Sequence, residues 1–508
     1  MHSSTKDQTR DDGGMEMQPS PIDDMAINEV DEDLKQDEKP KTSKLKAIIW
    51  DTWDKSPEER KTVNKIDWFI MTYVCIAYFV KYLYSLNQPS VSKDEANTRY
   101  RDQVNVQNAY VSGMQEDLAM GGQDYNLMQT LFTSGYVVGN LASQLVLLKV
   151  RPSIWLPSLE LIWSILVMGM AGAQNTNTIL VLRFFIGLLE ASAFPGILTL
   201  LGNWYTPAEL GKRSVIFIST SSAGSMFSGY LQAGLYSGMD GVQGLAAWRW
   251  LFIFDGIIGI PVAIYGFFAV PDAPHNSRAK WLKPHQRQMA IERMDRVGRR
   301  PPAKLSLQTF KDVLSHWPIY LFPIAFACHV LAIRIYSYFL VYLEDTGRWS
   351  VEAVNSIPSG GFAFQIVIGL VYAWVSDYYK TRVPVICAAC GVAMIGTIIL
   401  SVYPEHNLAA MMAGWILTYG ETGAGALIMT QVNEVCSFSS EHRVITIGWT
   451  EAFSYAMSAW VILFAYPSGQ APHFDYGFEL ATMFWAIEIL AILAIGYCAK
   501  KYPMKLRD

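Results

Sequence analysis

An arginine and a glutamate lie close together in an otherwise apolar run, which reads RFFIGLLEA from Arg183 to Ala191. A spacing of seven residues is nearly two helical turns, so both side chains lie on one helix face about 10 Å apart, and Gly187 leaves room between them. An arginine offers a fixed pair of N–H donors to a carboxylate, and burial favours the protonated form of a glutamate. We predict that Arg183 binds an anionic substrate and that Glu190 carries a proton. The alternative is a structural ion pair between the two residues, or contacts with a neighbouring helix.

Two further apolar runs carry polar side chains that suit the same site. Arg334 and Tyr338 are one helical turn apart and supply a second cation and a hydroxyl; alternatively, the arginine reaches towards the membrane surface. Glu421 lies in the glycine-rich run TYGETGAG, which either lines the cavity or packs closely against another helix. We add Arg334, Tyr338 and Glu421 to the predicted substrate site, and we expect His329 to be a core histidine whose hydrogen bonds are satisfied.

The composition indicates that these charges lie in a membrane. Of the 508 residues, 51% are hydrophobic and only 17% are charged, against about 25% charged residues in an ordinary soluble domain. Twelve membrane spans of about 20 residues need roughly 240 positions, close to half of the chain. The composition excludes a disordered protein, a collagen, a disulfide scaffold and most soluble multidomain enzymes, and it predicts a polytopic membrane protein.

Apolar runs of about 18–25 residues predict an all-α membrane protein with twelve transmembrane helices in two six-helix bundles. The bundles are assigned to residues 61–270 and 317–500, with a cytoplasmic loop at 271–316 between them and a cytoplasmic tail at 501–508. The predicted spans are 66–83, 125–148, 154–173, 178–200, 213–236, 248–270, 317–343, 356–376, 383–402, 408–431, 443–466 and 476–498.

Lysines and arginines collect on alternate loops, and their preference for cytoplasmic loops places both termini inside. The loop at 271–316 alone holds ten of them, and its stretch 283–297 is expected to form an amphipathic helix at the inner surface. Residues 1–60 are predicted to be a disordered acidic tail, because the first 40 residues hold twelve Asp and Glu against four Lys and Arg. No basic region followed by an apolar stretch precedes the first span, so we expect that span, and not a cleaved signal peptide, to direct the chain to the membrane.

One segment breaks the charge pattern. Residues Tyr84–Arg101 are polar, carry three basic residues on the outer side, and begin where the first span is still short. The codons for Leu83-Tyr84 and Tyr100-Arg101 permit GT and AG intron boundaries, and removal of the 54 nucleotides leaves a leucine codon and the reading frame intact. We interpret the segment as a translated intron; a genuine insertion in the outer loop is the alternative.

Removal of this segment would bring three polar residues into the first span. Asp102, Asn105 and Asn108 are spaced three apart and share one helix face. They either line the same cavity, where the two asparagines contact substrate, or form a hydrogen-bond network at its outer mouth.

Two sets of six spans joined by a long basic loop are the layout of the major facilitator superfamily, whose members bind substrate at the midplane between two rocking halves. From about residue 55 to the C-terminus, the chain resembles the fungal allantoate permease branch of the anion:cation symporters within that superfamily. The matching motifs are D-x-x-N at Asp102 and Asn105, R-x3-G-x2-E-A-x3-P-G from Arg183 to Gly196, W-Y-x3-E-x3-R from Trp204 to Arg213, and W-R-W-L-F at 248–252. Three stretches, at 55–61, 108–114 and 151–157, look more narrowly like fungal pantothenate transporters.

The resemblance implies a proton-coupled symporter of the plasma membrane that takes up a small carboxylate such as pantothenate. It implies an anion-binding role for Arg183 and proton-coupling roles for Glu190 and Asp102. Under this interpretation the protein works by alternating access between the two bundles.

The inner loops depart from the superfamily pattern. After the second span, the usual G-x3-D-R-x-G-R-R motif is replaced by KVRPS around Arg151, and a weaker counterpart follows the eighth span at Asp377, Lys380 and Arg382. We assign Arg151, Asp377 and Arg382 to an inner gate. The branch tolerates this change of loop, so we do not interpret it as inactivation.

Other classes of protein share some of these features. An efflux carrier for a secondary metabolite or another organic anion has the same twelve spans, and a receptor of transporter ancestry would bind its ligand without accumulating it. A membrane enzyme needs clustered ligands or a nucleophile, but the eight histidines are scattered and no glycine-rich phosphate loop is present. We therefore expect no enzyme activity, no cofactor, no metal site and no nucleic-acid partner. The expected partners are a small carboxylate, protons and the lipid bilayer, with the chain working as a monomer.

Sequencing of cDNA across the codons for Leu83 and Asp102 tests the intron. We expect mature transcripts that lack the 54 nucleotides encoding Tyr84–Arg101, because their removal lengthens the first span without a frame shift. If every transcript retains the segment, it is a genuine part of the outer loop.

Overall fold

The structure is a computed structural model that describes residues 50–504 apart from 51, 54, 84–113, 115–116, 121–123, 148, 240, 299–306, 340–341, 344–345, 350, 404–406 and 466–473. The predicted acidic tail up to residue 49 lies outside the described residues, as do the segment Tyr84–Arg101 and the three polar residues Asp102, Asn105 and Asn108. The chain divides into two compact units, Met1–Arg60 and Lys61–Asp508, and all helices below belong to the second unit apart from the start of α3.

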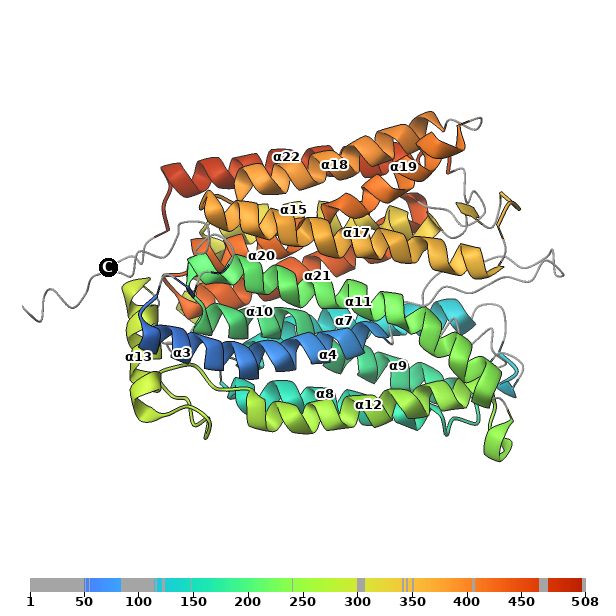
Figure 1. The fold of residues 1–508 in the computed structure, drawn as a ribbon, viewed down its shortest axis with the longest axis horizontal. Helices are drawn as coiled ribbons and strands as arrows, with labels where there is room; N and C mark the ends of the chain where they lie inside the picture. Colours follow the sequence, from blue (N-terminus) through green and yellow to red (C-terminus); the bar gives the residue numbers. More distant parts are fainter. Residues whose placement is uncertain are drawn as a thin grey trace, which may run out of the picture. The chain divides into compact units, whose positions relative to one another are not determined.

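The first half of the second unit is helical wherever the structure describes it apart from turns and connections (Figure 1). Its helices are α3 (Pro57–Ile66), the π-helical turn η1 (Asp67–Met71), α4 (Thr72–Leu83), α7 (Asp124–Leu147), α8 (Pro152–Met170), α9 (Thr176–Glu190), α10 (Ala193–Trp204), α11 (Pro207–Met239), the short 3-10 helix η3 (Val242–Gly244) and α12 (Ala247–Ala269).

The second half follows two short helices of the central loop. The loop helices are α13 (Pro284–Arg296) and α14 (Leu307–Leu314), so the helix expected at 283–297 is present. The remaining helices are α15 (Pro318–Ala332), the 3-10 helix η4 (Ile333–Tyr338), α17 (Val351–Tyr378), α18 (Val383–Val402), α19 (Leu408–Thr418), the 3-10 helix η5 (Tyr419–Glu421), α20 (Ala424–Val435), α21 (Ser440–Ala465) and α22 (Gly477–Lys501).

Each of the twelve predicted spans coincides with a helix, or with a pair of consecutive helices, within the described part of the chain. Eight of the described helical stretches are long and apolar enough to cross a membrane. The other four positions are α7, α11, α21 and the interrupted pair α19–α20. The three continuous helices of this set contain buried polar residues, among them Gln144, Ser222 and Glu451.

The two halves pack internally and then against each other. In the first half α7 lies against α9, α8 against α12 and α4 against α11, while in the second half α15 packs on α21 and α22, and α18 on α22 and α19. The halves meet where α7 contacts α21 and where α11 contacts α17. In Figure 1 the blue-to-green helices of the first half therefore lie on one side and the orange-to-red helices on the other. The polar helices α7, α11 and α21 thus form much of the contact between the halves.

The central-loop helix α13 is held against the first half by buried charge. Arg293 donates to Glu209 Oε2 at 2.6 Å, and both side chains are only 1% exposed. Lys65 Nζ lies 3.3 Å from Gln286 Oε1 on the same helix. Because one unpaired charge would be left in a buried site, loss of either member of the Arg293–Glu209 pair is strongly unfavourable.

Helices α7 and α9 approach each other so closely that glycines on one meet the backbone of the other. A Cβ atom at Gly135 would overlap the carbonyl oxygen of Phe184, and one at Gly187 would overlap the carbonyl oxygen of Phe132. Gly139 meets the backbone of α9 in the same way. The room that we expected Gly187 to leave is therefore occupied by α7.

Replacement of Gly187 by alanine is expected to lower the melting temperature of the purified protein by about 2–6 °C, because a Cβ atom forces the two backbones apart. Gly169→Ala is the matched control: it makes the same change near the end of a helix, where a Cβ atom meets nothing within 4 Å, and should leave the melting temperature unchanged or slightly raised. A Gly187→Ala protein as stable as the control would contradict the close approach of α7 and α9.

Candidate functional site

The fourth helix of each half is interrupted at its centre, only mildly in the first half, where Ala191 and Ser192 keep right-handed helical dihedral angles. In the first half α9 ends at Glu190 and α10 begins at Ala193, and Glu190 has 14 residues on either side in the span 176–204. In the second half η5 separates α19 from α20 and ends at Glu421, which has 13 residues before it and 14 after it between Leu408 and Val435. Each half therefore places a glutamate at the middle of a discontinuous helix.

Different residues accompany the two breaks. Pro195 is the third residue of α10, a position where the missing N–H of proline is tolerated because first-turn N–H groups have no partner within the helix. Gly423 has a φ of +108°, a left-handed backbone conformation that glycine adopts without strain. Interrupted helices at corresponding positions of two repeated halves point to the binding site of a membrane carrier.

The glutamate of the first break is paired with a lysine from the first helix of the same half. Lys81 Nζ on α4 lies 3.3 Å from Glu190 Oε1, and the two side chains are 8% and 13% exposed. The ammonium group also lies 5.8 Å from the centre of the Tyr78 ring and 5.3 Å from that of Tyr136. A buried lysine is thus stabilised by one carboxylate and by the faces of two aromatic rings.

The second break repeats this arrangement with a histidine in place of the lysine. His329 Nε2 on α15, the first helix of the second half, lies 3.5 Å from Glu421 Oε2, and its Nδ1 lies 3.2 Å from Glu488 Oε1 on α22. Glu421 also accepts a hydrogen bond from Gln365 Nε2 at 3.3 Å. Because Ser222 on α11 donates to Gln365 Oε1 at 2.9 Å, this network reaches from the second half to the first. The histidine expected to be a core residue is indeed buried and partnered, by two carboxylates.

A third glutamate lies at the boundary between the two pairs. Glu451 on α21 is 2% exposed and lies within electrostatic range of both Lys81 and His329. Next to it the rings of Tyr136 on α7 and Tyr455 on α21 are 4.4 Å apart, one from each half. Lys81, the two tyrosines and Glu451 therefore form a polar contact between the halves, which we call the central cluster together with Glu190.

The central cluster suits exchange of one anion for another. Buried ions are stable only when paired, and removal of one partner costs about 3–5 kcal/mol. Lys81 has two carboxylates near it, so protonation of Glu190 leaves the ammonium group without its nearest partner. An incoming carboxylate can then take that place.

Several residues that we placed in one site have different immediate surroundings. Arg183 is half-buried on α9 with its guanidinium 4.9 Å from the Phe132 ring centre, while Lys81 pairs with Glu190. Arg334 and Tyr338 lie on a 3-10 helix, in which residues four apart differ by about 120° instead of sharing a face.

The two residues of this 3-10 helix accordingly have different surroundings. Arg334 is half-buried within electrostatic range of Tyr455. Tyr338 is buried, and its ring lies 4.7 Å from that of Phe474 in an outer aromatic cluster. Roles in substrate binding for Arg183, Arg334, Tyr338 and Glu421 stay predictions.

Two of the three predicted gate residues lie together where the halves meet. Arg382 pairs with Asp377, lies 2.9 Å from Glu434 Oε1, and donates to the carbonyl oxygen of Pro207 in the first half at 2.8 Å. The backbone N–H of Lys212, also in the first half, donates to Asp377 Oδ2 at 3.1 Å. Asp377, at the end of α17, and Arg382, just before α18, thus link this turn to the start of α11.

The third gate residue lies elsewhere. Arg151 is 40% exposed, and its guanidinium lies 3.9 Å from Asp272, within the first half. Asp272 also accepts a hydrogen bond from the hydroxyl of Ser153 at 2.5 Å. These contacts connect the start of α8 with the residues just after α12, and among the described residues the ion pair of Arg151 stays within this half.

Of the central cluster only Glu190 was predicted from the sequence; Tyr136, Tyr455 and the two other charged members, Lys81 and Glu451, were not. Lys81 lies two residues from the end of the first predicted span, where a lysine is ordinarily at the membrane surface. Glu451 lies in the predicted span 443–466 and satisfied the same criterion that selected Glu190, an ionisable residue within an apolar run. Its omission was avoidable, whereas Lys81 becomes central only when it is seen beside Glu190.

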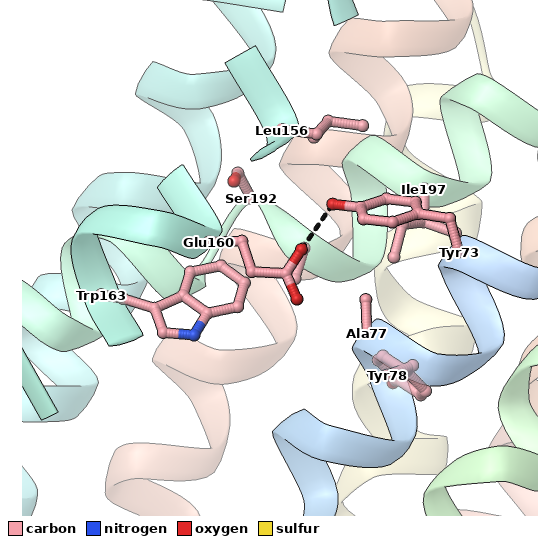
Figure 2. Close-up of a pocket in the computed structure, with 9 residues that line it drawn as sticks. Tyr73, Ala77, Tyr78, Leu156, Glu160, Trp163, Ser192 and Ile197 are labelled. Carbon is pink, nitrogen blue, oxygen red and sulfur yellow. Dashed lines mark hydrogen bonds between the residues drawn. The ribbon is translucent and has the colours of Figure 1, made fainter. Parts of the chain in front are cut away.

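A second polar site lies inside the first half and shares Tyr78 with the surroundings of Lys81. Tyr73 donates to Glu160 Oε2 at 2.6 Å, and Figure 2 shows this bond beside a small cavity. The cavity of about 10 Å³ is close to the minimum for one water molecule. It is lined by Tyr73, Ala77, Tyr78, Leu156, Glu160, Trp163, Ser192, Ala193 and Ile197. The cavity is too small for a carboxylate substrate.

A double-mutant cycle on thermal stability tests the partner of Glu190. We expect Lys81→Met and Glu190→Gln each to destabilise the protein, and the double variant to be less destabilised than the sum by about 1–3 kcal/mol, because neither charge is then left alone. The matched cycle pairs Glu190→Gln with Arg183→Gln, and its effects should add within about 0.5 kcal/mol. If the Arg183 cycle shows coupling and the Lys81 cycle shows additivity, Glu190 pairs with Arg183, which was the alternative considered from the sequence.

Comparison with known proteins identifies the family. The family model described as Major Facilitator Superfamily matches residues 102–461. MFS transporter PfmaC of Pestalotiopsis fici is 38% identical over 445 residues, which cover 86% of this chain and 80% of the relative. Pantothenate transporter liz1 of Schizosaccharomyces pombe is 30% identical over 455 residues, which cover 89% of this chain and 83% of the relative.

A solved structure agrees with the fold. The proton:xylose symporter XylE, bound to 6-bromo-6-deoxy-D-glucose, superposes with a TM-score of 0.59 at 12% identity, covering 87% of this chain and 97% of XylE. This similarity shows the fold alone, and membership of the allantoate permease branch stays a prediction. Because the family model matches most of the chain, this chain belongs to the major facilitator superfamily, whose members are membrane transporters of small molecules and not enzymes.

Proposed function

We propose that the protein is a secondary active transporter that takes up a small carboxylate, pantothenate or a similar vitamin or organic anion, together with protons. The observation that carries the proposal is the buried Lys81–Glu190 pair at the centre of a broken helix, facing Glu451 across the boundary between the halves. A relative 30% identical to this chain is named as a pantothenate transporter, which supports the choice of substrate class. We place the protein in the plasma membrane as a monomer with both termini in the cytoplasm.

Proton coupling follows from competition for one ammonium group. A proton on Glu190 removes its charge and releases Lys81, which then binds the carboxylate of the substrate. The loaded site carries one proton and one anion more than the empty site, so its net charge is unchanged and the cost of burial stays low. Arg183, two turns along α9 from Glu190, supplies a second cation for the anion as it enters.

The movement proposed for transport is a rocking of the two halves. The polar contacts between them, among the described residues, include the central cluster, the Ser222–Gln365–Glu421 network and the Asp377–Arg382 contacts with the start of α11. Arg443 on α21 also donates to Asn203 Oδ1 on α10. We propose that the Asp377–Arg382 contacts close the cytoplasmic side and break when the substrate is released there. In this scheme Arg151 stiffens the first half and does not form part of the gate.

Uptake of labelled pantothenate at pH 5 and pH 7.5, in yeast that lacks its own pantothenate carrier, tests the proposal. The chain is expressed with and without Tyr84–Arg101. We expect uptake by the shortened form, stronger at pH 5, because the Glu190 carboxylate must be protonated before Lys81 is free. If both forms reach the surface and neither takes up pantothenate, the substrate is wrong; loss of labelled carboxylate from preloaded cells would then assign the protein to the efflux carriers.

Three substitutions connect uptake with the central cluster. Lys81→Met and Arg183→Ala are expected to lower uptake per molecule at the cell surface about tenfold or more, since each removes a cation worth more than about 1.4 kcal/mol to a bound anion. Glu190→Gln should abolish the difference between the two pH values. Glu160→Gln is the matched control, because it neutralises another buried glutamate of the same half and should keep the wild-type pH ratio. A Glu190→Gln protein with that ratio would remove Glu190 from proton coupling.

A further inference from the structure

Two histidines and an aspartate from distant parts of the sequence meet next to the inner end of α21. Asp312 lies on α14, His316 follows two residues after that helix ends, and His442 lies in the first turn of α21. One potential ligand atom from each residue lies within 4.8 Å of the other two. None of the three belongs to the central cluster or to the predicted gate.

Apolar packing holds the two segments together. Val313 of α14 is 2% exposed and packs in one cluster with Ile445 of α21 and Ile319 at the start of α15. The side chains of Asp312 and His442 are thereby brought close, with His442 Nε2 3.0 Å from Asp312 Oδ2. The juxtaposition therefore depends on tertiary packing, and not only on the i, i+4 spacing that brings His316 Nδ1 to 3.9 Å from Asp312 Oδ1.

The histidine rings are oriented as metal ligands usually are. His316 Nδ1 lies 2.6 Å from the carbonyl oxygen of Asp312, and His442 Nδ1 lies 3.1 Å from Ser439 Oγ. Metal-binding histidines commonly use one ring nitrogen for such a hydrogen bond and the other for the metal. In both residues Nε2 is then the nitrogen left for a cation, which in His442 would take the place of the present contact between Nε2 and Asp312 Oδ2.

We propose that Asp312, His316 and His442 bind a divalent transition metal ion of the Zn²⁺ type. Two imidazoles and one carboxylate are a recurrent set of three protein ligands, with water in the fourth position, and imidazole selects transition metals over Mg²⁺ and Ca²⁺. Tetrahedral bonds of about 2.0–2.1 Å place donor atoms roughly 3.3 Å apart. Asp312 and His316, which are 29% and 18% exposed, have the freedom to close that distance by rotating about their side-chain bonds.

The site has a mechanical consequence. A bound metal ion joins α14 of the central loop to α21, the helix that carries Glu451 and Tyr455 at the boundary between the halves. Because α13 of the same loop is already attached to the first half through Arg293 and Glu209, the metal adds an attachment to the second half. The proposal does not depend on the identity of the transported substrate.

Metal binding to the purified full chain, prepared without a histidine tag, tests the site. The probes are Zn²⁺ alone and Co²⁺ alone, with Co²⁺ followed by its visible absorption and displaced by Zn²⁺. We expect one equivalent of bound metal and an increase in melting temperature with Zn²⁺. His316→Ala and Asp312→Ala should each weaken binding at least tenfold and abolish the thermal shift.

His285→Ala is the matched control, since it removes an exposed histidine from the same loop and should bind Zn²⁺ as the wild type does. Should His316→Ala unfold, His316→Cys keeps a metal ligand at this position. That variant is expected to show an additional near-ultraviolet sulfur-to-Co²⁺ charge-transfer band. The proposal is overturned by a wild-type chain that binds no metal, by a folded His316→Ala protein that binds with wild-type affinity, or by a Co²⁺ spectrum of His316→Cys without that band.

Discussion

Every buried charge at the centre of this molecule needs a partner, and few partners are available there. An ammonium or carboxylate group away from water is stable only beside an opposite charge or a hydrogen-bond partner. Lys81 meets this requirement through Glu190 and two tyrosine rings, and His329 meets it through Glu421 and Glu488. The helix breaks and the polar faces of α7, α11 and α21 are arranged around these few groups.

The two halves stabilise their buried charges with different side chains. Each pairs a base on its first helix with a glutamate at the break of its fourth helix, but one base is a lysine and the other a histidine. A lysine is ordinarily charged throughout the physiological pH range, whereas the charge of a histidine changes within it. This difference favours the first half as the side that holds an anion, with the second half supplying the hydrogen-bonded network around Gln365.

Much of the fold could be predicted from the sequence, because a membrane span requires a long apolar run wherever it lies. The positions of the helix breaks could not be predicted. Pro195 and Gly423 are compatible with an unbroken span, and only packing fixes where the helix is interrupted. The same limit applied to Arg334 and Tyr338, whose expected common face requires an α-helix and is lost in a 3-10 helix. Glu190 was recognised from sequence alone, but its pairing with Lys81 depends on the tertiary packing that brings the end of α4 within reach of the end of α9.

The backbone contact between α7 and α9 restricts how this carrier can be re-engineered. Gly135, Gly139 and Gly187 leave no volume for even a methyl group, so a library that randomises these helices uniformly spends part of its diversity on chains that do not fold. Tyr136 lies on α7 but directs its ring to Tyr455 of the second half, and Arg183 on α9 meets α7 through its side chain, over the Phe132 ring. A selection for new substrates gains most by varying those positions while the three glycines stay fixed.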